Sequence, residues 1–209
     1  MINLILVRHG QSQWNLENKF TGWKDIPLTE KGIFEAKQAG QLIKKNKIVF
    51  DKIFSSTLIR ANKTAEIAVR EAEMFNLFNN DELIYTRDQS LNERDYGDLV
   101  GLNKAETAEK FGKDQVHIWR RSYDTPPPNG ESLKNVVDRV SPYFNNKIEP
   151  LLFNNKNILI VAHGNSLRAI MIKVGLFKPE EISSIELPTG SPLCLEYNKN
   201  KLTSHFYLE

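Results

Sequence analysis

Three classes of protein are disfavoured by what this sequence lacks. It contains one cysteine, Cys194, so no disulfide can form within the chain and a cysteine-rich metal site is excluded. The 28 lysines and arginines nearly balance the 26 aspartates and glutamates, giving a formal net charge of +2. Because nucleic-acid-binding proteins usually carry a strong basic excess, we expect no nucleic acid partner. Any anion must be bound by a few placed cations.

Long apolar runs are also missing. Nowhere does the chain reach the ~18 consecutive apolar residues of a membrane helix, so we expect no membrane partner. The N-terminal run Leu4–Val7 leads into Arg8 instead of a cleavage site, which argues against a secretory signal. Cys194 lies in the apolar segment SPLCLEY and is expected to be a small buried hydrophobic residue. These features predict a cytoplasmic protein.

Short apolar runs alternate with longer amphipathic segments. The runs NLILV, VFDKIFSS, NILIVAHG and CLEY predict strands, and the segments between them predict helices. The alternation predicts an α/β fold of three layers (α/β/α), in which a mostly parallel sheet carries helices on both faces. A chain of 209 residues, 40% of them hydrophobic, suits a single domain spanning residues 1–209. The break DTPPPNGES is too short to separate two domains.

Several hydroxyl side chains stand where helices are expected to begin. They are Thr29, for a helix to about Lys45; Ser56 or Thr57, for a helix carrying Leu58–Glu73; and Ser132, for a helix carrying Leu133–Leu152. The segment KAETAEKFG predicts a short helix that ends at Gly112.

The segment ILVRHGQSQWN carries a predicted strand directly into a cation, an imidazole and a glycine. Arg8 offers a planar charged fork for phosphate oxygens, and His9 can be an unprotonated nucleophile near neutral pH. Gly10 would let the backbone turn sharply and approach a ligand closely. Taken alone, the tripeptide is also typical of a satisfied core histidine beside a solvated arginine, because short motifs match by chance.

A second histidine–glycine pair, His163 and Gly164, follows the apolar run ILIVA and precedes a predicted helix. Its amides would point at an anion bound at the helix N-terminus, and a protonated His163 would stabilise a transferring phosphoryl group. Ligands collect at the carboxyl ends of the strands in such a sheet, so we expect both histidines to meet over one phosphate. A metal site is disfavoured, because the four histidines contain no His-x-x-x-His pair.

Six longer segments carry a resemblance to a known family. They are LVRHGQSQWN, FTGWKDIPLTEKG, SSTLIRANKTAE, LNERDYGDLVGLNKAE, HIWRRSY and HGNSLRA…PTGSPL. The chain resembles the phosphoglycerate mutases that depend on 2,3-bisphosphoglycerate, a branch of the histidine phosphatase superfamily, over nearly its whole length. The resemblance implies the phosphoglycerate mutase-like fold and the glycolytic and gluconeogenic interconversion of 3-phosphoglycerate and 2-phosphoglycerate. It also implies priming by 2,3-bisphosphoglycerate without a metal.

The same resemblance implies a role for each candidate residue. His9 would carry the phosphate as N-phosphohistidine, and Glu93 would be the acid/base, for which a raised pKa is the best setting. The phosphoryl group would be surrounded by Arg8, Arg60, His163, Gly164 and Asn165. The substrate's carboxylate and second phosphate would be bound by Lys104, Arg120 and Arg121, with hydrogen bonds from Ser12, Asn15, Thr21, Gly22 and Tyr96.

Without the resemblance, some of these residues have an ordinary interpretation. Arg60 would be a surface arginine and Glu93 a solvated loop glutamate. Neighbours on a helix point about 100° apart, so one of Arg120 and Arg121 would lie at the surface.

The sequence departs from the family pattern at three places. Asp95 stands where many relatives have histidine, and its charge is expected to alter the pKa of Glu93. The segment around residues 122–131 is short where many relatives carry an insertion, which leaves a homodimer and a monomer both open. The sequence ends at SHFYLE, so we expect a reduced flap over the phosphoenzyme, and water access decides between mutase and phosphatase.

Two rival functions follow from the same residues. A histidine-type phosphatase acting on a small phosphorylated acid would use water as acceptor, but it has less need of Lys104, Arg120 and Arg121. A non-catalytic phospholigand-binding protein is expected to lack the nucleophile or the acid/base, whereas His9, Glu93 and His163 are all present. The sequence therefore favours a mutase.

Overall fold

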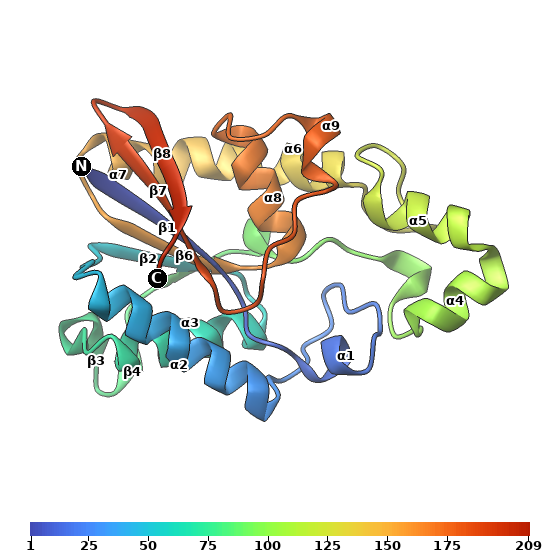
Figure 1. Cartoon of the computed structure of the whole chain (residues 1–209), viewed down its shortest axis with the longest axis horizontal. Helices are drawn as coiled ribbons and strands as arrows, with labels where there is room; N and C mark the ends of the chain where they lie inside the picture. The colour runs from blue at the N-terminus through green and yellow to red at the C-terminus, as the bar shows by residue number, and fades with distance from the viewer.

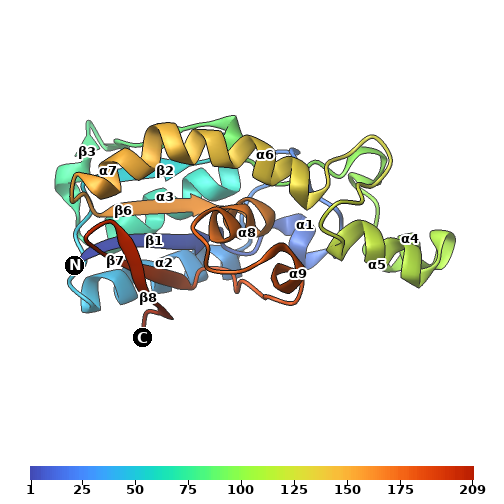
Figure 2. The same cartoon turned by 90° about the horizontal axis from the view of Figure 1, so that it is seen from above.

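A six-stranded sheet forms the centre of the computed structural model, which describes residues 1–209 (Figures 1 and 2). Its strand order is β5-β2-β6-β1-β7-β8. The parallel strands are β1 (Ile2–Arg8), β2 (Lys52–Ser55), β5 (Thr86–Arg87) and β6 (Ile158–Ala162). β7 (Pro192–Asn198) pairs antiparallel with β1, and β8 (Lys201–Tyr207) pairs antiparallel with β7. The mostly parallel sheet is confirmed, but β8 lies outside the predicted strands because KLTSHFY contains no apolar run.

Helices cover both faces of the sheet and complete the three predicted layers (Figure 2). One face carries α2 (Glu30–Lys45) and α3 (Ile59–Glu71), and the other carries α6 (Leu133–Tyr143), α7 (Glu149–Phe153) and α8 (Gly164–Lys173). Side chains of β1 alternate between the two cores: Leu4 and Leu6 belong to the α6/α8 side, and Ile5 and Val7 to the α2/α3 side. Burial on both faces explains the continuous apolar runs.

Two of the three predicted helix caps are confirmed. The Thr29 hydroxyl accepts a hydrogen bond from the Gly32 N–H at 3.1 Å, and Ser132 accepts one from the Asn135 N–H at 3.1 Å. The helix after Ser132 is interrupted between α6 and α7 by a π-helical turn at Phe144–Ile148. Pro142 and Pro150 flank this turn, and neither can donate a backbone hydrogen bond.

The predicted cap at Ser56 or Thr57 is wrong. α3 begins after Leu58, which has no side-chain cap bond. Ser56 Oγ accepts from the Leu58 N–H at 3.1 Å, just before the helix, and also lies 2.8 Å from His163 Nε2, while Thr57 Oγ1 donates to Asn92 Oδ1 at 2.9 Å. The contacts with His163 and Asn92 engage the two hydroxyls that local sequence preference assigned to the start of the helix.

The remaining helices lie mainly beyond the carboxyl ends of the parallel strands (Figure 1). They are α1 (Gln13–Leu16), α4 (Lys104–Phe111), α5 (Lys113–Arg121) and α9 (Pro179–Ile182). α4 ends at Gly112 as predicted, where a φ of +90° favours glycine. A small hairpin of β3 (Phe78–Asn79) and β4 (Glu82–Leu83) pairs apart from the main sheet. None of the helices has the length and apolar character needed to cross a bilayer.

Candidate active site

The adjacency of β1 and β6 brings the two predicted histidines together. Arg8 is paired with Ala162 in the parallel register, and the His9 N–H donates to the Ala162 carbonyl at 3.0 Å. The rings of His9 and His163 consequently lie 4.9 Å apart between centroids, with an interplanar angle of 61°. Both side chains are buried at the carboxyl end of the sheet.

Hydrogen bonding fixes which nitrogen of His9 can react. Nδ1 lies 2.7 Å from the Gly10 carbonyl oxygen, which only accepts, so Nδ1 carries the proton and Nε2 keeps its lone pair. Arg60 Nε donates toward this Nε2 at 3.3 Å. Burial lowers the pKa of His9 well below its ordinary value, as do the charges of Arg60 and Arg8, and the Gly10 bond opposes them only in part. His9 is therefore a neutral imidazole with Nε2 available as nucleophile.

His163 is also neutral in the free protein, unlike the protonated imidazole expected from the sequence. Burial lowers the pKa of His163 well below its ordinary value, and Arg60, His9 and Arg8 lower it further. Its Nε2 contacts Ser56 Oγ, while its Nδ1 is buried without a hydrogen-bond partner. A doubly negative phosphoryl group beside the ring would raise this pKa, because an opposite charge favours the protonated form.

Gly10 is needed for packing rather than for the sharp turn or ligand approach expected from the sequence. A Cβ at Gly10 would lie 2.2 Å from the carbonyl oxygen of Gly32, near the start of α2. A Cβ at Gly32 would in turn lie 2.1 Å from the Gln11 carbonyl oxygen. Each glycine thus lets the segment after the nucleophile rest directly on the backbone of α2.

Arg60 is a buried arginine of the site, not a surface residue of α3. Only 1% of it is exposed. Its guanidinium is held by the carbonyls of Lys24 and Gly22, with Nη1 donating at 2.8 Å and Nη2 at 2.9 Å. Burial lowers its pKa to about 10, so it stays charged at neutral pH beside His9. Gly22, predicted as a ligand contact, here supplies a carbonyl that orients Arg60.

The Glu93 carboxylate contacts the N-terminus of α8, and Glu93 lines the same cavity as His9. Its Oε1 accepts hydrogen bonds from the Arg94 N–H at 2.8 Å, from Asn165 Nδ2 at 2.9 Å and from the Asn165 N–H at 3.2 Å. Burial alone would raise the pKa of Glu93, but these bonds and the charges of Arg60 and Arg8 outweigh it and lower the pKa. Glu93 is therefore ionised and can accept a proton. Its lowered pKa differs from the raised pKa that would suit an acid/base best.

Asp95 does not act on Glu93 in the way expected from the sequence. Its Oδ1 accepts a hydrogen bond from the Gly97 N–H at 2.9 Å. The forces that shift the pKa of Glu93 come instead from burial, from Arg94 and Asn165, and from the two site arginines.

His9, Arg60 and Glu93 line a cavity of about 150 Å³ that is rich in positive charge, whereas His163 lies behind its wall. It is lined by Arg8, His9, Asn15, Lys19, Thr21, Arg60, Glu93, Tyr96, Lys104, Arg120, Arg121, Gly164, Asn165, Arg168 and Glu186. Seven of these side chains are cationic and two are carboxylates, in a protein whose net charge is only +2. The cavity is therefore built for a small ligand with several negative charges.

Arg120 and Arg121 both reach the cavity although they are neighbours in the last turn of α5. Arg121 Nη2 pairs with Glu186 Oε1 at 2.7 Å, and its Nη1 donates to the Ser183 carbonyl at 3.1 Å. Arg120 is exposed, as expected for one of the pair, and Arg121 is half-buried, yet both side chains line the cavity.

Comparison with known proteins identifies the family. The chain matches the family model described as "Histidine phosphatase superfamily (branch 1)" over residues 4–208. It belongs to the histidine phosphatase superfamily. Relatives named 2,3-bisphosphoglycerate-dependent phosphoglycerate mutase include that of Methylocella silvestris, 52% identical over 91% of this chain and 89% of the relative. That of Beijerinckia indica is 50% identical over 94% of this chain and 92% of the relative. The resemblance seen in the six sequence segments is confirmed.

Solved structures agree on the histidine phosphatase fold. A mycobacterial glucosyl-3-phosphoglycerate phosphatase in complex with VO3 superimposes with a TM-score of 0.78 at 25% identity, covering 94% of this chain and 93% of that chain. Bacillus stearothermophilus YhfR gives the same TM-score and identity, covering 97% and 95%. The phosphoglycerate mutase-like architecture predicted from the sequence is confirmed.

Three residues that line the cavity of this superfamily member were not predicted from the sequence: Lys19, Arg168 and Glu186. Arg168 lies four positions after Gly164 on α8, so helical spacing could have placed both on one face. Lys19 and Glu186 carried no such signal, since the irregular segments that hold them have no fixed period.

Ser12, like Gly22 and His163, is a predicted site residue that does not line the cavity. It is fully buried and caps α1, with its Oγ accepting from the Asn15 N–H at 3.3 Å. Its own N–H donates to Asn15 Oδ1 at 3.1 Å, so Ser12 orients a side chain that does line the cavity.

The two buried histidines make stability depend on pH. Below the ordinary histidine pKa of about 6.5, the unfolded chain binds a proton at each ring, whereas the folded chain, with both pKa values lowered, does not. The free energy of unfolding should therefore fall as the pH drops below about 6.5, by up to about 2.7 kcal/mol per pH unit for two protons. Urea unfolding between about pH 7.5 and pH 5 measures the slope. A constant free energy over this range would show that the folded protein protonates both rings.

Metal ligands are not grouped anywhere in the fold: no three His, Cys, Asp or Glu side chains are placed to hold one ion. The cationic walls of the cavity would supply the charge that surrounds a phosphoryl group.

Proposed function

We infer that this protein interconverts 3-phosphoglycerate and 2-phosphoglycerate in glycolysis and gluconeogenesis, through a phosphohistidine and a 2,3-bisphosphoglycerate intermediate. The observation that carries this inference is the neutral Nε2 of His9, which faces a small polycationic cavity with the ionised Glu93 beside it. Relatives at about 50% identity over most of the chain carry the mutase name.

The cycle follows from this arrangement. Phosphorylated His9 donates its phosphoryl group to the 2-hydroxyl of 3-phosphoglycerate: the P–N bond breaks, a P–O bond forms, and Glu93 takes the hydroxyl proton. The 2,3-bisphosphoglycerate then reorients in the cavity. His9 Nε2 attacks the 3-phosphate, the P–O bond at C3 breaks, and Glu93 returns its proton to that oxygen. The products are 2-phosphoglycerate and the regenerated phosphohistidine.

The proposed binding roles divide the cavity in two. Arg8, Arg60 and His163, with the start of α8 at Gly164 and Asn165, bind the phosphoryl group in transfer. The substrate carboxylate and second phosphate are bound by Lys104, Arg120 and Arg121, with hydrogen bonds from Asn15, Thr21 and Tyr96. The missed cations Lys19 and Arg168 belong to this second set. Ser12 and Gly22 act from behind, by orienting Asn15 and Arg60.

The proposal extends to the setting of the enzyme. 2,3-bisphosphoglycerate primes His9, no metal takes part, and the enzyme works in the cytoplasm as a monomer or homodimer on small phosphoglycerates. The single cysteine agrees with a cytoplasmic setting, and the balanced charge agrees with small phosphoglycerates as the binding partners.

A phosphatase is the second candidate, because a solved structure with the same fold is a glucosyl-3-phosphoglycerate phosphatase. The two reactions differ in the acceptor, which is a substrate hydroxyl in the mutase and water in the phosphatase. Lys104, Arg120 and Arg121 favour the mutase, since they can hold the acceptor's own acidic groups.

A single assay separates the two candidates. The protein is incubated with a chelator and 2,3-bisphosphoglycerate, and 3-phosphoglycerate is then added. We expect 2-phosphoglycerate to accumulate while free phosphate stays low. Release of free phosphate in step with substrate loss would establish the phosphatase instead. Activity lost to the chelator and restored by a divalent metal would contradict the metal-free proposal.

A further inference from the structure

A second polar network lies behind Glu93, outside the cavity. We propose that Arg139 and Glu131 form a clamp that positions Glu93 for proton transfer. The clamp, meaning these two side chains and their bonds to the segment 90–95, touches neither the cavity nor the reacting atoms. The proposal rests on the proposed acid/base role of Glu93.

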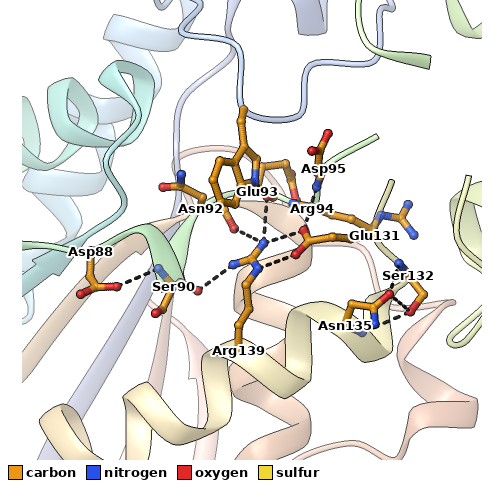
Figure 3. A network of polar contacts seen from close by, with 11 residues as sticks. Asp88, Ser90, Asn92, Glu93, Arg94, Asp95, Glu131, Ser132, Asn135 and Arg139 are labelled. Carbon is orange, nitrogen blue, oxygen red and sulfur yellow. Dashed lines mark hydrogen bonds and ion pairs between the residues drawn. The ribbon is translucent and has the colours of Figure 1, made fainter. Parts of the chain in front are cut away.

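Arg139 is the centre of the clamp. It projects from α6 toward the segment that carries Glu93 (Figure 3). Its Nη1 donates to the Ser90 carbonyl at 2.8 Å, and its Nη2 donates to the carbonyls of Asn92 at 3.1 Å and Glu93 at 3.0 Å. One rigid guanidinium therefore fixes three backbone carbonyls up to and including that of Glu93 itself.

Glu131 holds both Arg139 and the chain on the other side of Glu93. Its two carboxylate oxygens accept from Arg139 Nε at 2.8 Å and Nη2 at 2.9 Å, which is a bidentate pair (Figure 3). Its Oε2 also accepts from the Asp95 N–H at 2.9 Å, and its own N–H donates to the Asp95 carbonyl at 2.8 Å. The backbone is thus fixed both before and after Glu93.

A third contact closes the network on the remaining side. Trp23 Nε1 donates to the Glu93 carbonyl at 2.6 Å, and the Trp23 ring centre lies 5.7 Å from the Arg139 guanidinium carbon. The Glu93 carbonyl is therefore shared between two donors from distant parts of the chain. Donors from the Trp23 loop and from α6 therefore both restrain the backbone at Glu93.

This rigidity matters because the Glu93 carboxylate has to meet several groups at once. Its Oε1 accepts from Arg94 and from two nitrogens of Asn165, and Glu93 lines the same cavity as His9. These bonds keep its pKa low, so a displaced backbone would weaken them and let the pKa rise. A displacement of about 1 Å at a reacting group can reduce a rate by about 10²-fold. The clamp thus acts on catalysis through Glu93.

The test is a double-mutant cycle with Arg139→Gln and Glu93→Gln. In the otherwise unchanged enzyme, Arg139→Gln should lower kcat by about 10- to 100-fold, with KM for 3-phosphoglycerate changed less than about threefold. In the Glu93→Gln background the same change should cost less than about twofold, because the group that it positions is already lost. Glu131→Gln should give a smaller loss than Arg139→Gln, and Arg139→Lys a partial rescue.

The pH profile gives an independent readout. We expect the acid limb of kcat for Arg139→Gln to move to higher pH, since Glu93 would be more easily protonated. The charge of Arg139 also lowers the pKa of His163, so the shift is assigned to Glu93 only if it disappears in the Glu93→Gln background. The matched control is Arg70→Gln, which removes an arginine that also binds a carboxylate and a carbonyl, both of Asp81, at the surface. It should leave kcat and the profile unchanged. Urea unfolding and binding of inorganic phosphate check that each variant folds with an intact cavity.

The outcomes separate this proposal from the proposed function. If the losses from Arg139→Gln and Glu93→Gln multiply and the pH profile stays fixed, the clamp is structural and the positioning role is overturned, while the mutase remains. If Glu93→Gln itself has no effect on kcat, the acid/base role fails and the positioning role fails with it.

Discussion

His9→Ala is expected to abolish the phosphoenzyme and to lower mutase turnover by about 10⁴-fold or more. His9 Nε2 is the one neutral nucleophile aimed at the polycationic cavity, and alanine offers no atom that can form a P–N bond. His163 does not replace it, because His163 is fully buried and does not line the cavity. Mass spectrometry after treatment with 2,3-bisphosphoglycerate, together with the acid lability of the added phosphate, measures the result.

The control for this variant is His205→Ala, which removes an exposed imidazole on β8, outside the cavity. It should take up phosphate as the unchanged protein does. His9→Ala leaves a buried gap, so urea unfolding and binding of inorganic phosphate should accompany the assay. An acid-labile phosphate retained by a folded His9→Ala protein would remove His9 from the role of carrier.

Glu93→Gln is expected to lower kcat by about 10²- to 10⁴-fold while changing the affinity for inorganic phosphate little. The amide keeps the shape of the side chain and one acceptor oxygen, but it cannot take the hydroxyl proton. The cations that bind phosphate, including Arg8 and Arg60, are untouched. Steady-state kinetics with 3-phosphoglycerate and calorimetry with inorganic phosphate separate the two effects.

Glu106→Gln on the exposed side of α4 is the matched control and should behave like the unchanged enzyme. An unchanged turnover for Glu93→Gln would show that another group, or bulk water, handles the proton. A loss of phosphate affinity equal to the loss of turnover would show that Glu93 serves to organise the cavity.

Local patterns predicted much of the fold. The apolar runs of β1 and β6 are visible in the sequence itself. The hydroxyls of Thr29 and Ser132 bond to residues only three positions away, so a local sequence pattern is enough to predict both caps. The adjacency of the two histidines was also within reach, because parallel strands in such a sheet end at one edge.

Effects that depend on distant partners could not be predicted in this way. Ser56 reads locally as a helix cap, yet His163, far along the chain, engages its hydroxyl. The neutral state of His163 and the lowered pKa of Glu93 depend on burial and on arginines from other elements. Glu186 reaches the cavity from an irregular segment through its pairing with Arg121. The family resemblance supplied roles for residues, but not these charge states.

The contact between Gly10 and Gly32 bears on how one histidine can react with both phosphates of 2,3-bisphosphoglycerate. The backbone at Gly10 packs directly on the backbone at Gly32, so the segment beside His9 has no room to move from one phosphate of the ligand to the other. His9 Nε2 therefore keeps one position, and it is the bisphosphate intermediate that must reverse its orientation in the cavity. The width of the cavity, and not a hinge near His9, then governs whether the intermediate reorients before water enters the cavity.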